Sequence, residues 1–388
     1  MKQFFAAILL LTCSLLCART PVDEFNRQLG IELLKSGNNA WYFPGCRARL
    51  QKSQIKLQSS PGRHSAVLRG KMLLGSPCQE LVILTDSGNR KIEAIELVYA
   101  NKGDVSKRTK VKIRQANKNL KARLTAGFGT PEKKRYGSGS KRQQNKVEVW
   151  QCGNFEIILN TEKDEYCLLI IRPQQTAGAK KEFQIDSEAL KKNVKRNDFG
   201  DVYLTNIPMV DQGSKGYCAV ATAARVMLYF GLKDLDQHKL ADEASSDSKN
   251  GTYVLTLKKA LAPVRKKYDL KQSGSYKIDM KFIARYIDMG VPIFWQMYST
   301  KAYNNLRHQN SFLRKKTASA EAWEKFLRHQ KKIKKSTDGP HICLIIGYNE
   351  TTGEIAVSNS WGAHENAPSW IPINAAETVN RGCWAIHP

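Results

Sequence analysis

The segment of residues 208–219 constrains this chain more than any other part of its sequence. It reads Pro-Met-Val-Asp-Gln-Gly-Ser-Lys-Gly-Tyr-Cys-Ala, which places an amide, Gln212, six residues before a thiol, Cys218, across a glycine-bearing turn. A helix-forming, alanine-rich run follows, so we expect Cys218 in the first turn of a helix. Free N–H groups and the helix dipole stabilise a thiolate at that position, so the segment predicts a nucleophile.

Two polar residues further along the chain extend this pattern. His341 opens an apolar run of strand length, and Asn359 follows a second short strand, residues 354–357. If the two strands are adjacent and antiparallel, His341 and Asn359 lie side by side and complete a Cys-His-Asn constellation with Cys218. Each residue alone has an ordinary explanation, as a core cysteine, a structural histidine or a turn. The prediction of catalysis depends on their combination.

The order of these motifs resembles the papain-like cysteine peptidases over residues 200–388. The residues that carry the resemblance are Gln212, Cys218, His341 and the Asn-Ser-Trp-Gly segment that starts at Asn359. The flanking segments are similar to the bacterial branch related to bacteriocin-leader peptidases, the peptidase C39-like branch. The segment before the cysteine that ends at Gln212, and the stretch 236–241 after the helix of Cys218, carry this similarity.

The resemblance implies a role for each residue. Cys218 would be the nucleophile, His341 the general base and acid, and Asn359 the group that orients the imidazole. Gln212 would donate to the oxyanion, and Trp361 would shield the bond between histidine and asparagine. The sequence departs from the papain pattern at Ala219, where tryptophan is usual, and has only Gly251 in place of a Gly-Gly pair. The chemistry is therefore implied more strongly than the substrate.

The length of the chain, 388 residues, is enough for two domains, and its hydrophobic fraction of 41% is typical of globular proteins. We predict an α+β fold in which a papain-like domain, with a nucleophile helix and an antiparallel sheet, follows a smaller α+β domain without a recognisable chemical motif. The predicted parts are a signal peptide at 1–20, the N-terminal domain at 21–173, a linker with a connecting helix at 174–199 and the peptidase domain at 200–388.

Periodicity and turn signals predict the individual elements of both parts. The predicted helices are 21–40, 104–126, 182–198, the run after Cys218, 234–246, 252–266, 279–289 and 320–333, the last within a basic insertion at 299–338. The predicted strands are 66–74, 81–85, 91–99, 147–152, 155–160, 165–172 and 292–298, besides those at His341 and 354–357, and 133–146 is predicted to be a basic loop. The helix in the insertion is predicted to pack on the domain, the alternative being a lid or a docking helix.

The first residues are typical of a secretory signal. Met-Lys-Gln precedes an apolar run, residues 4–17, that is too short to span a membrane as a mature helix. We expect a secreted, periplasmic or cell-surface protein with no transmembrane segment in the mature chain. A buried helix, or a lipid anchor on Cys13 or Cys17, is the alternative.

The cysteine count supports export, because seven of the nine cysteines follow the signal and an odd number in an exported chain indicates one free thiol, Cys218. Four others either form two disulfides or are reduced and buried: Cys46, Cys78, Cys152 and Cys167. No cysteine spacing is typical of a metal site, and we expect neither a metal nor a cofactor.

The net charge is large, since 62 Lys and Arg against 35 Asp and Glu give +27. An anionic surface is therefore a candidate partner, but no aromatic residues alternate with the basic ones as in a specific nucleic-acid site. We predict a peptidase that cleaves a protein or peptide through a thioester. The alternatives are an acyltransferase or amidase on the same scaffold, and a non-catalytic basic binding protein.

Overall fold

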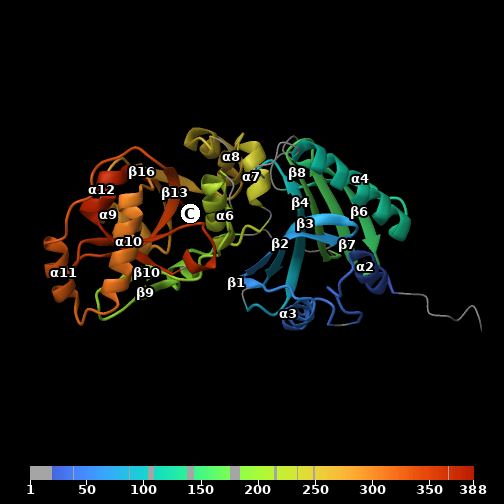
Figure 1. The fold of residues 1–388 in the computed structure, drawn as a ribbon, viewed down its shortest axis with the longest axis horizontal. Helices are drawn as coiled ribbons and strands as arrows, with labels where there is room; N and C mark the ends of the chain where they lie inside the picture. Colours follow the sequence, from blue (N-terminus) through green and yellow to red (C-terminus); the bar gives the residue numbers. More distant parts are fainter. Residues whose placement is uncertain are drawn as a thin grey trace, which may run out of the picture.

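The structure is a computed structural model that describes residues 20–388, except 38, 87, 104–108, 138–143, 175–183, 214–215, 234, 248–249 and 366. It contains two antiparallel sheets of eight strands each, one in each half of the chain, with helices packed on both (Figure 1). This mixture of helices and antiparallel sheets confirms the predicted α+β fold. The predicted signal peptide lies outside the described residues.

The N-terminal half is one sheet covered by helices. Its strands follow the order β1-β2-β3-β4-β8-β7-β6-β5. The helix α4 lies across the sheet, and its buried residues share a core with the two short helices α2 and α3 and the covered face of the sheet (Figure 1). The bounds are α2 Pro21–Leu29, α3 Phe43–Lys52, β1 Gln58–Ser60, β2 Arg63–Leu73, β3 Ser76–Thr85, β4 Ile92–Asn101, α4 Thr109–Phe128, β5 Glu132–Tyr136, β6 Asn145–Cys152, β7 Phe155–Glu162 and β8 Tyr166–Pro173.

Two predictions for this half are wrong in part, and one helix was not predicted. The helix predicted over 21–40 ends at Leu29, because Gly30 takes the left-handed conformation (φ 81°) that closes a helix. The helix α3 was not predicted, although proline is well accommodated in a first helical turn. The start of the predicted basic loop is the edge strand β5, whose charged side chains are exposed. Residues 104–108 of the predicted helix 104–126 lie outside the described residues.

The C-terminal half packs its helices on a second sheet, in the order β11-β16-β12-β13-β10-β9, with β14 pairing β13 and β15 pairing β14. The bounds are α5 Ser187–Lys191, β9 Val194–Arg196, β10 Val202–Leu204, α6 Cys218–Tyr229, α7 Gln237–Glu243, α8 Val254–Lys267, β11 Lys271–Ser275, α9 Met280–Asp288, β12 Ile293–Tyr298, α10 Lys301–Arg314, α11 Ala320–Arg328, β13 Pro340–Asn349, β14 Glu354–Ser358, β15 Ser369–Pro372, α12 Ile373–Val379 and β16 Asn380–His387.

Most predicted elements of this half are present, but β10, β11, β15, α12 and β16 were not predicted, and two predicted segments differ. The connecting helix predicted over 182–198 is only the five residues of α5, and β9 follows it and joins the second sheet. The basic insertion contains two helices, α10 and α11, and both pack on the domain. The Trp323 side chain of α11 is buried, and its indole N–H donates to the Glu354 carboxylate at 3.0 Å. The predicted boundaries at residues 173 and 200 stay predictions.

The two halves meet at the segment that leads into Gln212. The Arg63 guanidinium donates to the Met209 carbonyl at 3.1 Å, and the Met209 N–H donates to the Ser60 hydroxyl at 3.1 Å. On the other side, the Lys233 ammonium donates to the Thr85 carbonyl at 2.8 Å. The β1–β2 hairpin of the first sheet is thereby fixed to the chain just before the predicted site (Figure 1). Across the described residues, we find no helix with the length and apolar character needed to cross a bilayer.

Candidate active site

Cys218 is the first residue of α6, as the sequence predicts, and the residue is partly exposed. The helix forms because its residues are mostly alanine and aliphatic side chains that bury almost completely. Thr222, one turn further, donates its hydroxyl to the Ile342 carbonyl at 3.2 Å, which holds α6 against β13. The six other cysteines of the described chain are buried: Cys46, Cys78, Cys152, Cys167, Cys343 and Cys383.

The seven cysteines within the described residues are free thiols, so neither disulfide considered for the N-terminal half is formed. The argument from an odd number of cysteines therefore does not single out Cys218. Partial exposure of the residue does, because Cys218 is the one cysteine of the described chain that is not buried. Burial raises the pKa of the thiols of Cys46, Cys152, Cys167, Cys343 and Cys383 to about 12.

His341 and Asn359 lie together, as predicted from the two strands. The strands β13 and β14 pair antiparallel, and the imidazole Nε2 of His341 is 3.1 Å from the Oδ1 of Asn359. The amide oxygen only accepts, so Nε2 carries the proton and donates, and the neutral ring keeps Nδ1 as its acceptor. The Trp361 ring lies over the imidazole, with 4.8 Å between the ring centroids and an interplanar angle of 30°.

The Cys218 thiol lies against the same strand. The backbone N–H of Ile342, the residue after His341, is directed at the sulfur, together with the N–H groups of Ala219 and Cys218 itself. Burial nevertheless raises the pKa of the Cys218 thiol above its ordinary value, and these donors only oppose that rise. The structure thus brings the nucleophile helix, the histidine strand and the asparagine loop together.

The charge state of His341 follows from its burial. Burial, together with the nearby Arg307 charge, lowers the pKa of the imidazole to about 4, although the hydrogen bond with Asn359 and the Glu365 charge oppose this shift. Near neutral pH the resting site therefore holds a neutral imidazole beside a neutral thiol. A proton that passes from the thiol to the imidazole creates an ion pair without changing the net charge of the site.

Gln212 is tied to the asparagine loop. Its side-chain Oε1 accepts from the Ser360 hydroxyl at 2.8 Å, and its backbone N–H donates to the Ser360 carbonyl at 2.8 Å. Because the amide oxygen of Gln212 faces Ser360, the side-chain nitrogen is on the other side of the amide group and is the atom that donates. All five residues singled out from the sequence are thus placed on three neighbouring segments.

Sequence reasoning missed a buried ion pair behind Asn359. The Glu365 carboxylate accepts from the Asn359 side-chain N–H at 3.0 Å and binds the Arg307 guanidinium through two contacts of 2.6 and 2.8 Å. Arg307 comes from α10 in the basic insertion, and its guanidinium also lies 5.9 Å from the centre of the Trp361 ring. Through Arg307 and Glu365, the basic insertion therefore helps to hold Asn359 in place. No local pattern in the sequence indicates this contact.

Arg225 is a second buried cation that holds the site together. From within α6 it donates to the Pro208 carbonyl at 3.0 Å, to the Asn359 carbonyl at 2.8 Å and to the Ser358 hydroxyl at 2.7 Å. Burial lowers the pKa of this guanidinium to about 10, which still leaves it charged at neutral pH. A signal was present in the sequence, since Arg225 is the single charged residue in the otherwise apolar run after Cys218.

Gly216 is required by a close backbone approach. A Cβ at this position would lie 2.7 Å from the Asp247 carbonyl oxygen and 3.1 Å from the Cα of Gly251. A larger residue would therefore push apart the two segments. Gly251, considered in the sequence as a substitute for the usual Gly-Gly pair, lies beside the turn that leads to Cys218.

Comparisons with known proteins show what the C-terminal half of the chain is similar to. Residues 204–386 match the model of the Peptidase C39-like family. Among solved structures, the chain is similar to a protein described as a C39-like peptidase from Bacillus anthracis, at 14% identity over 48% of this chain and 98% of that one, with a TM-score of 0.32. It is also similar to xylellain, a cysteine protease from Xylella fastidiosa, at 15% identity over 55% of this chain and 94% of that one, with a TM-score of 0.31.

No curated protein matches the chain. The family match confirms the resemblance stated from the motifs, and it supports a cysteine peptidase that acts on a protein or peptide. Residues 204–386 are therefore similar to the C39-like branch of the papain-like cysteine peptidases.

Proposed function

We propose that this protein is a secreted cysteine peptidase that uses Cys218, His341 and Asn359 as its catalytic triad. The observation that carries the proposal is the His341–Asn359 hydrogen bond, formed on the strand that also contacts the Cys218 thiol. The bond fixes the imidazole so that Nδ1 is the nitrogen able to take the thiol proton. Gln212 and Trp361 support this triad.

The proposed reaction has two stages. In the first, the Cys218 proton moves to His341 while the sulfur bonds to the substrate carbonyl carbon. The Gln212 side-chain N–H and the Cys218 backbone N–H stabilise the oxyanion, and His341 then protonates the leaving amine as the C–N bond breaks. In the second, His341 takes a proton from water, the hydroxide attacks the thioester, and the acid leaves while the thiol is restored.

Export and basic surfaces complete the proposal. The lysine followed by an apolar run at residues 1–20 supports a secretory signal, and the net charge of +27 supports binding to an anionic surface. The substrate is a protein or peptide, in keeping with the family match.

The rate at which iodoacetamide alkylates Cys218, followed against pH, tests the triad. Below the pKa of His341, about 4, the imidazole is protonated and cannot accept the thiol proton, so alkylation is slow. Above it the thiolate–imidazolium form becomes accessible, and we expect labelling to rise and reach a plateau in the acid to neutral range. Peptide mapping by mass spectrometry separates Cys218 from the buried thiols, which serve as internal references.

The matched variants are His341→Gln and His329→Gln, the latter an exposed residue that follows α11. His341→Gln should move the onset of labelling to alkaline pH, and His329→Gln should leave it unchanged. Onset only at alkaline pH in the unaltered protein would favour the non-catalytic binding protein instead. An added amine that appears in the product would favour the acyltransferase.

Replacing the predicted oxyanion donor should reduce turnover without abolishing it. For Gln212→Ala we expect kcat to fall by about 10²–10³-fold, since one oxyanion donor contributes roughly 2.7–4 kcal/mol to the barrier. Ser360→Ala keeps the amide but removes its anchor, so the loss should be smaller. Steady-state hydrolysis of a labelled denatured protein measures both, with exposed Gln51→Ala as the control. An unchanged kcat in Gln212→Ala would remove this residue from the mechanism.

A further inference from the structure

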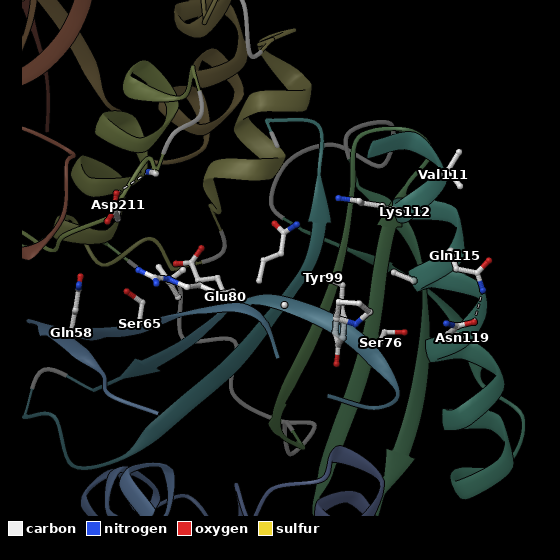
Figure 2. Close-up of a pocket in the computed structure, with 17 residues that line it drawn as sticks. Gln58, Ser65, Ser76, Glu80, Tyr99, Val111, Lys112, Gln115, Asn119 and Asp211 are labelled. Atoms are coloured by element: carbon white, nitrogen blue, oxygen red, sulfur yellow. Dashed lines mark hydrogen bonds between the residues drawn. The ribbon is translucent and has the colours of Figure 1, made fainter. Parts of the chain in front are cut away.

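A pocket of about 770 Å³ opens between α4 and the β2–β3 hairpin of the N-terminal half (Figure 2). Its size is in the range of sites that hold small ligands or several peptide side chains. At one end its wall includes Asp211 and Gly213, the two neighbours of Gln212. The pocket therefore connects the N-terminal half to the turn that carries the proposed oxyanion donor.

The wall on the sheet side is shaped by a bulge in β2. Val67 lies opposite Glu80 and Lys71 lies opposite Cys78, so four steps along β2 match only two along β3. The extra residues turn through positive φ angles at Arg69 (47°) and at the glycine after it (83°). Bulges of this kind redirect side chains next to sites, and here Val67 and Arg69 line the pocket.

The pocket is apolar and holds polar groups without partners. Val67 and Val111 face it with 68% and 63% of their surfaces exposed, which is unusual for valine. Ser76 and Tyr99 also line it and are buried, yet neither hydroxyl has a hydrogen-bond partner among the described residues. Both hydroxyls are enclosed within the protein, so the surface that the pocket offers to a ligand is the apolar wall that includes Val67 and Val111.

The charge of the pocket favours an anionic ligand. Glu80 is neutralised by Arg63 at 3.1 Å, and Asp211 accepts from the Gly213 N–H at 2.8 Å. Arg69 and Lys112 are exposed on the wall, and neither forms an ion pair with a carboxylate in the described part of the chain. Figure 2 shows Lys112 reaching from α4 into the opening.

We propose that this pocket is a substrate-binding exosite. It would hold an extended segment of the peptide substrate that has a large apolar side chain flanked by acidic residues. The remainder of the peptide would continue past the Asp211–Gly213 turn toward Cys218. This inference rests on the proposed peptidase function, and it assigns to the N-terminal half the selection of substrates.

Binding to the full-length Cys218→Ala protein tests the exosite without requiring turnover. The probes are two pools of short fluorescein-labelled peptides, one with leucine or phenylalanine flanked by glutamates and one with the same residues flanked by lysines. Fluorescence polarisation should show tighter binding of the glutamate pool. The double substitution Arg69→Glu with Lys112→Glu should weaken that binding by about tenfold or more, because two attractive charges become repulsive.

The control is Lys118→Glu, an exposed change on α4 that lies outside the pocket. It should bind the glutamate pool like the Cys218→Ala protein. Val111→Asp should weaken that binding, because it puts a negative charge in place of part of the apolar wall. Melting curves check that each variant is folded. We expect no loss of stability, because all four substituted positions are exposed. Equal binding of both pools, or unchanged binding in the double variant, would overturn the exosite. The same pocket substitutions made in the protein that retains Cys218 allow its alkylation to be followed. That readout reports the triad separately, so failure of one proposal is not failure of the other.

Discussion

The Cys218→Ala protein should hydrolyse a labelled denatured protein at least about 10⁶-fold more slowly than the parent, which is the scale seen when an enzyme loses its nucleophile. The reason is that no other thiol can take over the reaction. The six remaining cysteines of the described chain are buried, including Cys343 on the strand of His341. Single-turnover hydrolysis and trapping of the thioester measure the loss.

The control for this substitution is Cys383→Ala, which removes a buried thiol on β16 in the same half of the molecule. It should keep full activity, and both variants should melt like the parent, since alanine is close to cysteine in size. Cys218→Ser would show whether a hydroxyl can replace the thiolate, and we expect it to be as inactive as the alanine variant. A Cys218→Ala protein that retained turnover would contradict the triad.

Local patterns in the sequence predicted the parts of the site that local structure determines. The alanine-rich run after Cys218 forms α6, and the apolar runs at His341 and 354–357 form β13 and β14. Once the strands pair, the positions of His341 and Asn359 follow from strand geometry. These residues were therefore predictable before any tertiary contact was known.

The supports of the site were not predictable, because they depend on distant contacts. Arg307 and Glu365 are 58 residues apart and meet only when α10 packs against the loop after β14. The pocket in the N-terminal half likewise depends on how that half docks on the segment before Gln212. In the same way the helix predicted over 182–198 has the right composition locally, yet β9 pairs with β10 over part of that range.

The buried ion pair between Arg307 and Glu365 should be the most sensitive support of the active site. Their side chains are 2% and 7% exposed and meet at 2.6 Å. Glu365→Ala leaves the guanidinium buried without its partner, which typically destabilises a fold by about 3–5 kcal/mol. It also removes the acceptor of the Asn359 side chain, so His341 loses its orientation. We therefore expect a lower melting temperature and a fall in kcat larger than any change in KM.

The pH dependence of unfolding shows whether ionised Glu365 stabilises the folded protein. Burial opposes ionisation of Glu365, but hydrogen bonds from Arg307 and Asn359 outweigh it and hold the pKa of this carboxyl below its ordinary value. The stabilisation is therefore present above the ordinary glutamate pKa and is lost as the pH falls through the lowered one. Denaturant unfolding of the parent and of Glu365→Ala should accordingly converge at acid pH.

A double-substitution cycle separates the ion pair from simple loss of packing. Arg307→Met combined with Glu365→Gln leaves no unpaired charge, so the double variant should be more stable than the two single changes predict by addition. Its kcat should still be low, because Asn359 and Trp361 lose the charged groups that hold them. The matched control is Arg328→Met, which breaks the exposed Arg328–Glu324 pair on α11 and should change neither melting nor kcat. Additive losses of stability, or full kcat in the double variant, would show that the pair does not position the triad.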